Sequence, residues 1–254
     1  SADKAVWMKN SSVYHGSDLT TSTMNDSCGW GVTGTKLSAN NPVEVTGKIA
    51  KAQSFDGVDD YINLGIQLNP YLVSNTPFSF EAIVKTNGTA YRVIFGNADW
   101  QSPYIGVAIA LLSTGKLRVE LNQSDIKYLR VDTTTDVFND DVYHHITVTY
   151  DGTFSGSYGG IKIYKNSVLS AMTLQNNNID GSATSTTNLQ LGARDGSNAP
   201  FIGVIDEVRI LNSVLTPEYT KASYNALFNT LVIIGSTETS ASFLANYLWW
   251  TGED

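Results

Sequence analysis

Short runs in which apolar and polar residues alternate recur along most of the chain. In the segment 78–86, FSFEAIVKT, every second residue from Phe78 to Val84 is apolar, which is the period of a half-buried strand. Residues 116–121 alternate in the same way after a Thr-Gly turn and predict a hairpin. We expect further strands at 5–8, 52–56, 61–64, 90–95, 104–112, 128–132, 143–150, 161–165, 168–173, 188–192 and 201–211. This spacing predicts an all-β protein with two antiparallel sheets packed as a sandwich.

The stretch 201–219, FIGVIDEVRILNSVLTPEY, contains the last of these strands and the only predicted helix. Strict alternation places Ile205, Glu207, Arg209 and Leu211 on one face, and Val204, Asp206, Val208 and Ile210 on the other. Asp206 then lies on an otherwise apolar face, which costs free energy unless its carboxylate is paired. Thr216 as N-cap and Pro217 at the first helical position predict a short helix near 217–226.

The two ends of the chain depart from this pattern. Residues 1–50 contain the predicted strand 5–8 and then a long loop rich in Ser, Thr, Asn and Gly, which needs a role or some structure of its own. Residues 229–254 contain a predicted strand at 231–234 and the apolar sequence FLANYLWW. This tail either packs back on the domain or contacts a neighbouring domain or subunit. We expect one domain over 1–254, with its core sandwich at 51–228.

Composition narrows the possible functions. The net charge is −8 and the chain has no cluster of Lys and Arg, so a nucleic-acid partner is not expected. There is no run of about 18 apolar residues, so we expect no membrane span. The single cysteine, Cys28, cannot form an internal disulfide. Few charges and abundant Ser, Thr, Asn and Gly are typical of an extracellular, cell-surface or virion-associated β protein.

Five stretches together resemble one known family. The segment GVIDEVRILNSVLTPEY at 203–219 resembles the closing segment of laminin-G-like, concanavalin A-like jelly-roll domains. Four more stretches resemble segments of the same family and occur in the same order as in its members. They are SFDGVDDYINLG (54–65), PFSFEAIVKTNG (77–88), VYHHITVTYDGT (142–153) and IKIYKNSVL (161–169). The resemblance implies a concanavalin A-like jelly roll over roughly 50–228. Because this scaffold carries lectins, carbohydrate-binding modules, glycosidases, lyases and adhesive domains, it does not imply a single function.

The resemblance also implies a structural calcium ion. Many members hold Ca²⁺ with the Asp of the closing strand and with carbonyls near the early loop. In this sequence the corresponding residues are Asp206 and the turn Phe55-Asp56-Gly57. Carboxylate and carbonyl oxygens are the ligands that Ca²⁺ prefers. The alternative is that Asp206 accepts hydrogen bonds from backbone amides or pairs with Arg209 or another cation.

No catalytic residues are predicted. Glucanases of this fold carry a Glu-x-Asp-x-Glu strand, because retaining hydrolysis needs two carboxyl groups about 5 Å apart. This chain lacks that motif, and Glu81 and Glu120 have no acidic partner at i+2 or i+4. Acids could still meet across strands. His144 and His145 are adjacent on a strand and point to opposite faces, so they cannot bind one metal together. We expect one of them to pack inward and the other to lie on the surface.

Three loops carry the residues expected to bind a ligand. Sugar sites combine aromatic rings with polar side chains that hydrogen-bond to hydroxyls. The loops 97–104, 153–160 and 194–198 offer both kinds of residue. The predicted ligand-binding residues are Asp99, Trp100, Gln101, Tyr104, Tyr158, Arg194 and Asp195. Tyr91 and Tyr128 are further candidates, although the sequence does not fix which way they face.

These features favour a non-catalytic, lectin-like carbohydrate-binding or adhesive module whose partner is a polysaccharide or another glycan. One alternative is a purely structural or interaction domain of a surface or phage-particle assembly, which the apolar tail favours. The other is a glycoside hydrolase or polysaccharide lyase whose acidic residues meet across strands.

Overall fold

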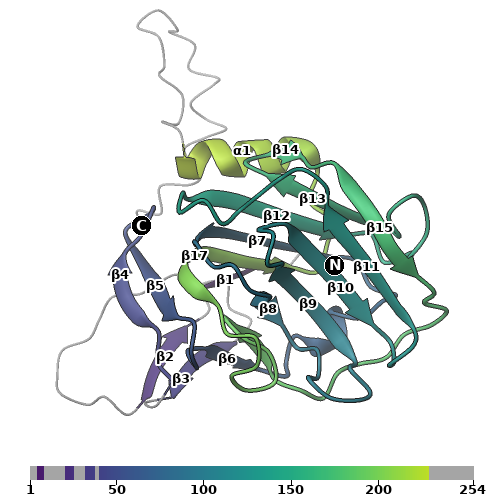
Figure 1. The fold of residues 1–254 in the computed structure, drawn as a ribbon, viewed down its shortest axis with the longest axis horizontal. Coiled ribbons are helices and arrows are strands. Elements are labelled where there is room, and N and C mark those ends of the chain that lie inside the picture. Colours follow the sequence, from purple (N-terminus) through teal and green to yellow (C-terminus); the bar gives the residue numbers. More distant parts are fainter. Residues whose placement is uncertain (1–4, 9–20, 26–31, 38–39, 229–254) are drawn as a thin grey trace, which may run out of the picture.

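The computed structural model describes residues 5–8, 21–25, 32–37 and 40–228. Cys28, the predicted strand at 231–234 and the aromatic tail lie outside the described residues. Two antiparallel sheets pack face to face, and one helix, α1 (Pro217–Phe228), lies outside them (Figure 1). The predicted sandwich is therefore confirmed.

The first sheet has eight strands. Along the sheet they are β14 (Val168–Leu169), β13 (Ile161–Lys165), β12 (His144–Tyr150), β7 (Phe78–Lys85), β17 (Ile202–Leu211), β5 (Lys51–Asp56) and β4 (Val43–Thr46), with β1 (Ala5–Met8) also paired to β17. The longest strand, β17, lies at the centre between β7 and β5.

The second sheet has nine strands. In order they are β15 (Met172–Asn177), β11 (Tyr128–Thr133), β10 (Leu117–Asn122), β9 (Gly106–Leu111), β8 (Arg92–Gly96), β16 (Leu189–Leu191), β6 (Ile62–Gly65), β3 (Thr33–Leu37) and β2 (Thr21–Asn25). A short 3-10 helix, η1 (Asn69–Tyr71), follows β6.

The hydrophobic core fills the space between the two sheets. Alternate residues of each strand point into it, so Phe80 of one sheet stacks on Phe95 of the other with ring centroids 4.7 Å apart. Phe78 and Tyr150 meet on neighbouring strands at 5.5 Å. Fully burying a side chain of this size stabilises the fold by roughly 1.5–3 kcal/mol. The side chains on the outer faces of the two sheets are not part of this core.

Two sequence predictions about strands are wrong. The long loop expected within residues 10–50 contains β2, β3 and β4. The sequences of β2 and β3, TSTMN and TGTKL, are polar and show no clear period, and VEVT of β4 alternates over only four residues. The strand expected at 168–173 is two strands: β14 completes a hairpin with β13, and β15 pairs with β11 in the other sheet. The chain changes sheet between them, at residues 170–171.

The face assignment predicted for the closing strand is wrong beyond Asp206. The ladder between β17 and β7 pairs Asp206 with Ile83 and Arg209 with Glu81, so β17 contains one extra residue. This β-bulge includes Glu207, whose φ is +47°. Ile205, Val208 and Ile210 therefore all face the core. Asp206 lies on the opposite face and does not share a face with Val208 and Ile210.

Helix α1 covers the outer face of the eight-stranded sheet. It begins as predicted, because the Thr216 hydroxyl accepts a hydrogen bond from the amide of Tyr219 at 3.2 Å. The ring of Tyr224 lies 6.1 Å from that of His145, which is fully buried. The expectation that one histidine lies on the surface is therefore wrong, since His144 is also buried. In the described part of the chain no helix is long and apolar enough to span a membrane.

Candidate functional site

The polar residues of β10 and β11 lie on the outer face of the nine-stranded sheet. Leu117, Val119 and Leu121 of β10 belong to the core, so Glu120 between them points away from it. On β11, Arg130 lies opposite Glu120 in the ladder. A pocket of about 470 Å³ lies over these strands. It is lined by Tyr91, Trp100, Tyr104, Glu120, Asn122, Ser124, Asp125, Tyr128, Arg130 and Arg194.

Two exposed aromatic rings form one side of the pocket. Trp100 is 41% exposed and Tyr104 is 42% exposed, which is unusual for side chains of this size. The amide of Trp100 donates a hydrogen bond to Asp195 Oδ2 at 3.1 Å, and this bond connects the two loops that flank the pocket. Tyr104 and Asp195 both adopt left-handed backbone conformations, which are rare for residues other than glycine and are often found at binding sites.

Glu120 is the centre of the pocket floor and is almost completely buried. Three arginines reach its carboxylate: Arg130 Nε at 3.2 Å, Arg118 Nη1 at 3.7 Å and Arg194 Nη1 at 3.8 Å. Arg118 also makes a bidentate pair with Asp132, with both N–O distances 2.7 Å. A buried carboxylate requires such compensation, because its desolvation is otherwise very unfavourable.

Aromatic rings hold two of these arginines in place. The Arg194 guanidinium lies over Trp100, with Cζ 4.8 Å from the ring centroid, and 5.5 Å from the centroid of Tyr91. The Arg130 guanidinium lies over Tyr128 at 4.7 Å. Cation–π contacts of this kind contribute roughly 0.5–2 kcal/mol and fix the guanidinium plane. Burial raises the pKa of Tyr91 to about 12, and the charge of Glu120 acts in the same direction, so its phenol stays protonated.

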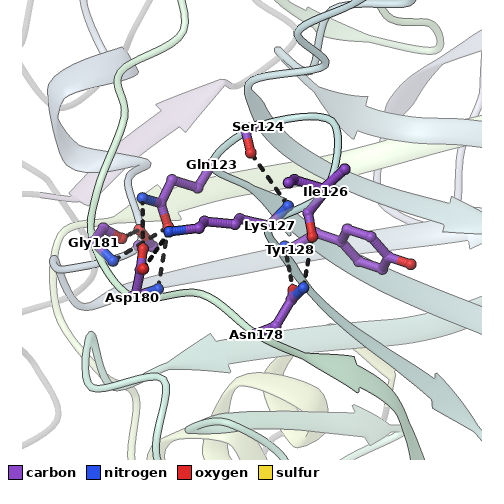
Figure 2. A network of polar contacts seen from close by, with 9 residues as sticks. Gln123, Ser124, Ile126, Lys127, Tyr128, Asn178, Asp180 and Gly181 are labelled. Carbon is purple, nitrogen blue, oxygen red and sulfur yellow. Dashed lines mark hydrogen bonds and ion pairs between the residues drawn. The ribbon is translucent and has the colours of Figure 1, made fainter.

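A polar network supports the turn between β10 and β11 (Figure 2). Residues of this turn also line the pocket. The Gln123 amide group contacts Asp180 and the backbone of Gly181, and Lys127 forms an ion pair with Asp180. Asn178 accepts a hydrogen bond from the amide of Tyr128 at 2.9 Å. These contacts tie the turn to the segment that follows β15. They thereby position the pocket-lining residues Asn122, Ser124, Asp125 and Tyr128.

Three of the seven predicted ligand-binding residues line this pocket. Trp100, Tyr104 and Arg194 line the pocket, together with the two further candidates Tyr91 and Tyr128. Three other predicted residues lie in the two flanking loops. Asp99 and Gln101 are the neighbours of Trp100 in the sequence, and Asp195 accepts the hydrogen bond from the Trp100 amide. The Asp99 carboxylate accepts a hydrogen bond from the hydroxyl of Thr187. Tyr158 does not line the pocket; it packs against the hydrophobic core.

Sequence reasoning missed the floor of the pocket. Glu120 was considered only as an isolated acid, and the missed residues are Glu120, Asn122, Ser124, Asp125 and Arg130. A signal was present, because polar residues alternate with apolar ones on two consecutive predicted strands. Such alternation places Arg118, Glu120 and Arg130 on one face when the strands pair.

The residues expected to bind calcium do not form one ligand set. Burial raises the pKa of Asp206, and its carboxylate accepts a hydrogen bond from the amide of Ile49 at 2.9 Å, in agreement with the amide alternative. Asp56 of β5 pairs with Ile202 of β17. Ile202 lies four residues before Asp206, which is about 13 Å along the strand. Asp56 does have acidic neighbours: its carboxylate lies within 4.8 Å of those of Asp59 and Asp60. Calcium binding stays a prediction.

Two antiparallel sheets packed as a sandwich are consistent with the fold of concanavalin A-like domains. The chain belongs to this family: the model described as the concanavalin A-like lectin/glucanases superfamily matches residues 56–219. The family suggested by the sequence is therefore confirmed. No curated protein sequence matches the chain.

Several solved structures share the fold. The binding domain of Paraclostridial Mosquitocidal Protein 1 is 12% identical with a TM-score of 0.63; the match covers 89% of this chain and 52% of that one. A second structure is domain 4 of AbnA, an extracellular GH43 arabinanase from Geobacillus stearothermophilus, in complex with arabinotriose. It is 20% identical with a TM-score of 0.56, and the match covers 86% of this chain and 98% of that one. The Ruminococcus gnavus IT-sialidase CBM40 bound to α2,3-sialyllactose is 16% identical with a TM-score of 0.52; the match covers 73% of this chain and 97% of that one. This chain thus spans about half of the mosquitocidal structure, and all three similar structures are domains rather than whole proteins.

Proposed function

We propose that this protein is a non-catalytic carbohydrate-binding module and that the pocket on the nine-stranded sheet is its glycan site. The observation that carries the proposal is the pairing of two exposed rings, Trp100 and Tyr104, with a polar floor in one pocket. Sugar rings have apolar faces that stack on aromatic side chains and hydroxyls that need hydrogen-bond partners. Two of the similar structures were solved with arabinotriose and sialyllactose, which supports a sugar as ligand.

The polar residues of the rim supply the remaining contacts. Asn122 ends β10, Ser124 and Asp125 lie on the supported turn, and all three line the pocket. Amide and hydroxyl groups can donate hydrogen bonds to sugar hydroxyls and accept them, whereas an ionised carboxylate only accepts them. The Asp125 carboxylate already accepts a hydrogen bond from Ser102 at 2.6 Å and is therefore held at the rim. A ring stacked on Trp100 would present its hydroxyls to these groups.

The arrangement of Glu120 argues against glycoside hydrolysis at this pocket. Hydrolysis needs one carboxyl that protonates the leaving oxygen and a second that acts as nucleophile or base. Oε1 of Glu120 is within reach of Arg118 and Arg130, and Oε2 is within reach of Arg194. Glu120 therefore supports the arginines. The binding domain of the mosquitocidal protein and the sialidase CBM40, which share the fold of this chain, are likewise binding domains.

An extracellular or surface location follows from this function, since polysaccharides and glycoconjugates are found there. The domain of AbnA to which this chain is similar belongs to an extracellular enzyme. We further propose that any bound Ca²⁺ has a structural role, because Asp56, Asp59 and Asp60 lie on the turn between β5 and β6, outside the pocket lining.

A glycan array on the purified protein, run with calcium and again with EDTA, tests the proposal. We expect saturable binding that Trp100→Ala weakens by about tenfold, or about 1.4 kcal/mol. Tyr219→Ala is the matched control, because this ring on α1 is similarly exposed (39%) but lies on the other sheet. No binding to any glycan by the folded protein would refute the proposal and favour a structural domain. Equal losses in both variants would refute the assigned pocket.

A further inference from the structure

The pocket floor concentrates positive charge on an acidic protein. The chain has a net charge of −8 and contains five arginines, three of which converge on Glu120. Among the described residues, the ion pairs of Arg118, Arg130 and Arg194 involve two carboxylates, those of Glu120 and Asp132, while Asp125 lies at the exposed rim. The floor therefore carries a surplus positive charge in a partly desolvated place, where charges interact more strongly than at an exposed surface.

The surplus belongs to Arg130 and Arg194. Arg118 is saturated by its bidentate pair with Asp132, whereas the contacts of Arg130 and Arg194 to Glu120 are longer, at 3.2 and 3.8 Å. Within the described part of the chain, Arg194 Nε and the hydroxyl of Tyr91 have no hydrogen-bond partner, and Arg130 Nε faces Glu120 Oε1 at 3.2 Å without the geometry of a hydrogen bond. Buried donors are normally paired, so a floor with this many spare donors is short of acceptors. A ligand rich in acceptor oxygens would supply them.

The two guanidinium groups are also oriented in advance. Arg194 is held by the rings of Trp100 and Tyr91, and Arg130 by the ring of Tyr128. A planar guanidinium matches a carboxylate through parallel hydrogen bonds, and one already fixed in place loses little entropy on binding. Glu120 acts as a positioning residue, because it draws both arginines towards the same point.

We propose that the ligand of this pocket is an acidic sugar, whose carboxylate pairs with Arg194 and Arg130 while its ring stacks beside Trp100. This inference rests on the proposed function, since it names the class of glycan bound at the same site. Uronic acids and sialic acids share the required chemistry, a carboxylate on a pyranose ring.

One acidic residue of the pocket opposes an anionic ligand. Asp125 lies at the rim and is exposed, so water and salt screen its charge far more than that of the buried Arg194. The inference therefore predicts that Asp125→Asn, which keeps the shape and removes the repulsion, binds the acidic sugar more tightly by a few-fold. A neutral sugar that used Asp125 as an acceptor would instead bind more weakly.

Calorimetric titration with matched ligands tests the inference. The pairs are trigalacturonate against its methyl ester, and sialyllactose against its methyl ester. We expect one acid to bind at least about tenfold more tightly than its neutral counterpart, with affinity falling as salt is raised. Arg194→Gln should abolish the preference, and Arg194→Lys should restore it only in part. Lys162→Gln is the control, because it removes the same charge from an exposed position on β13.

The outcomes separate the two proposals. If an acid and its neutral counterpart bind equally and Trp100→Ala weakens both, the inference is overturned while the carbohydrate-binding function stands. If an acid is preferred but Arg194→Gln behaves like Lys162→Gln, the carboxylate binds elsewhere and the inference also fails. If the array and the titrations show no sugar binding by the folded protein, both proposals fail together.

Discussion

Replacing Arg209 by methionine should expose how strongly the buried ion pair beneath α1 depends on both partners. Arg209 Nη1 lies 3.1 Å from Glu81 Oε2 and donates a hydrogen bond to the Ser223 hydroxyl at 2.8 Å. Glu81 is 1% exposed and Arg209 is 6% exposed. Methionine keeps an unbranched apolar side chain and removes the charge, so the carboxylate loses its cation without a large cavity forming.

The expected loss follows from what remains around Glu81. Removing one member of a buried ion pair costs about 3–5 kcal/mol, because the other charge is left uncompensated. Glu81 keeps neutral donors, since Thr147 donates to Oε1 at 3.3 Å and Ser223 lies 3.4 Å from Oε2. We therefore expect a loss near the lower limit, about 3 kcal/mol in the free energy of unfolding at pH 8.

The loss should shrink at low pH. Burial raises the pKa of Glu81, and Arg209, Ser223 and Thr147 lower it only in part, so without Arg209 the pKa rises further. The folded state then binds a proton more readily than the unfolded state, whose carboxyl has the ordinary pKa near 4.5. The stabilising effect of this proton is complete below the unfolded pKa and is lost as pH rises through the folded pKa. The variant should thus approach the wild type between pH 8 and pH 5.

Urea unfolding followed by circular dichroism at pH 8 and pH 5 measures both effects. Lys85→Met breaks a surface pair of 3.7 Å and should cost less than about 1 kcal/mol. The double variant Glu81→Gln/Arg209→Met should recover much of the loss, because no buried charge remains. Glycan affinity should not change, since the pocket lies on the other sheet. An Arg209→Met loss that is independent of pH, or equal in the double variant, would refute this account.

Three further predictions concern the helix cap, the turn network and the metal. Thr216→Ala should lower the unfolding free energy by about 1 kcal/mol and Thr216→Ser should not, because the hydroxyl caps α1; urea unfolding would show this. Gln123→Ala should weaken glycan binding a few-fold in calorimetry with little change in melting temperature, since it loosens the turn that carries Asp125; unchanged affinity would exclude that role. Calcium should raise the melting temperature of the wild type but not of Asp60→Asn if the ion binds at the Asp56–Asp60 turn, and identical curves in EDTA would remove calcium from the proposal.

The sequence predicted the strands whose two faces differ in polarity. β7, β10 and β12 were found because their inward residues are apolar at every second position. Local pattern does not show to which sheet a strand belongs, so the change of sheet between β14 and β15 was missed. The polar strands β2 and β3 were missed because their sequences resemble a loop.

The site divides in the same way. Its loop half was predicted, because an aromatic residue surrounded by polar ones, such as Trp100, is a local signal. Its floor depends on Glu120, Arg130 and Arg194 meeting from separate strands and loops. The pairing of β10 with β11 brings Glu120 and Arg130 together, and Arg194 reaches them from a loop. Alternation along each strand showed the faces of the first two residues but not this pairing. From the sequence, Glu120 was therefore considered as a catalytic acid, whereas in the structure its carboxylate holds three arginines.

The extra residue in β17 has a consequence for how this strand can be compared and edited. Because Glu207 occupies the bulge, the residues on either side of it continue one inward and outward alternation as if it were not there. Deleting Glu207 should leave Val208 and Arg209 on their present faces. Deleting a residue from a regular part of the ladder would instead exchange the faces of every later residue. A single gap in an alignment of this strand therefore belongs at Glu207, and a shorter relative is expected to have lost its residue there.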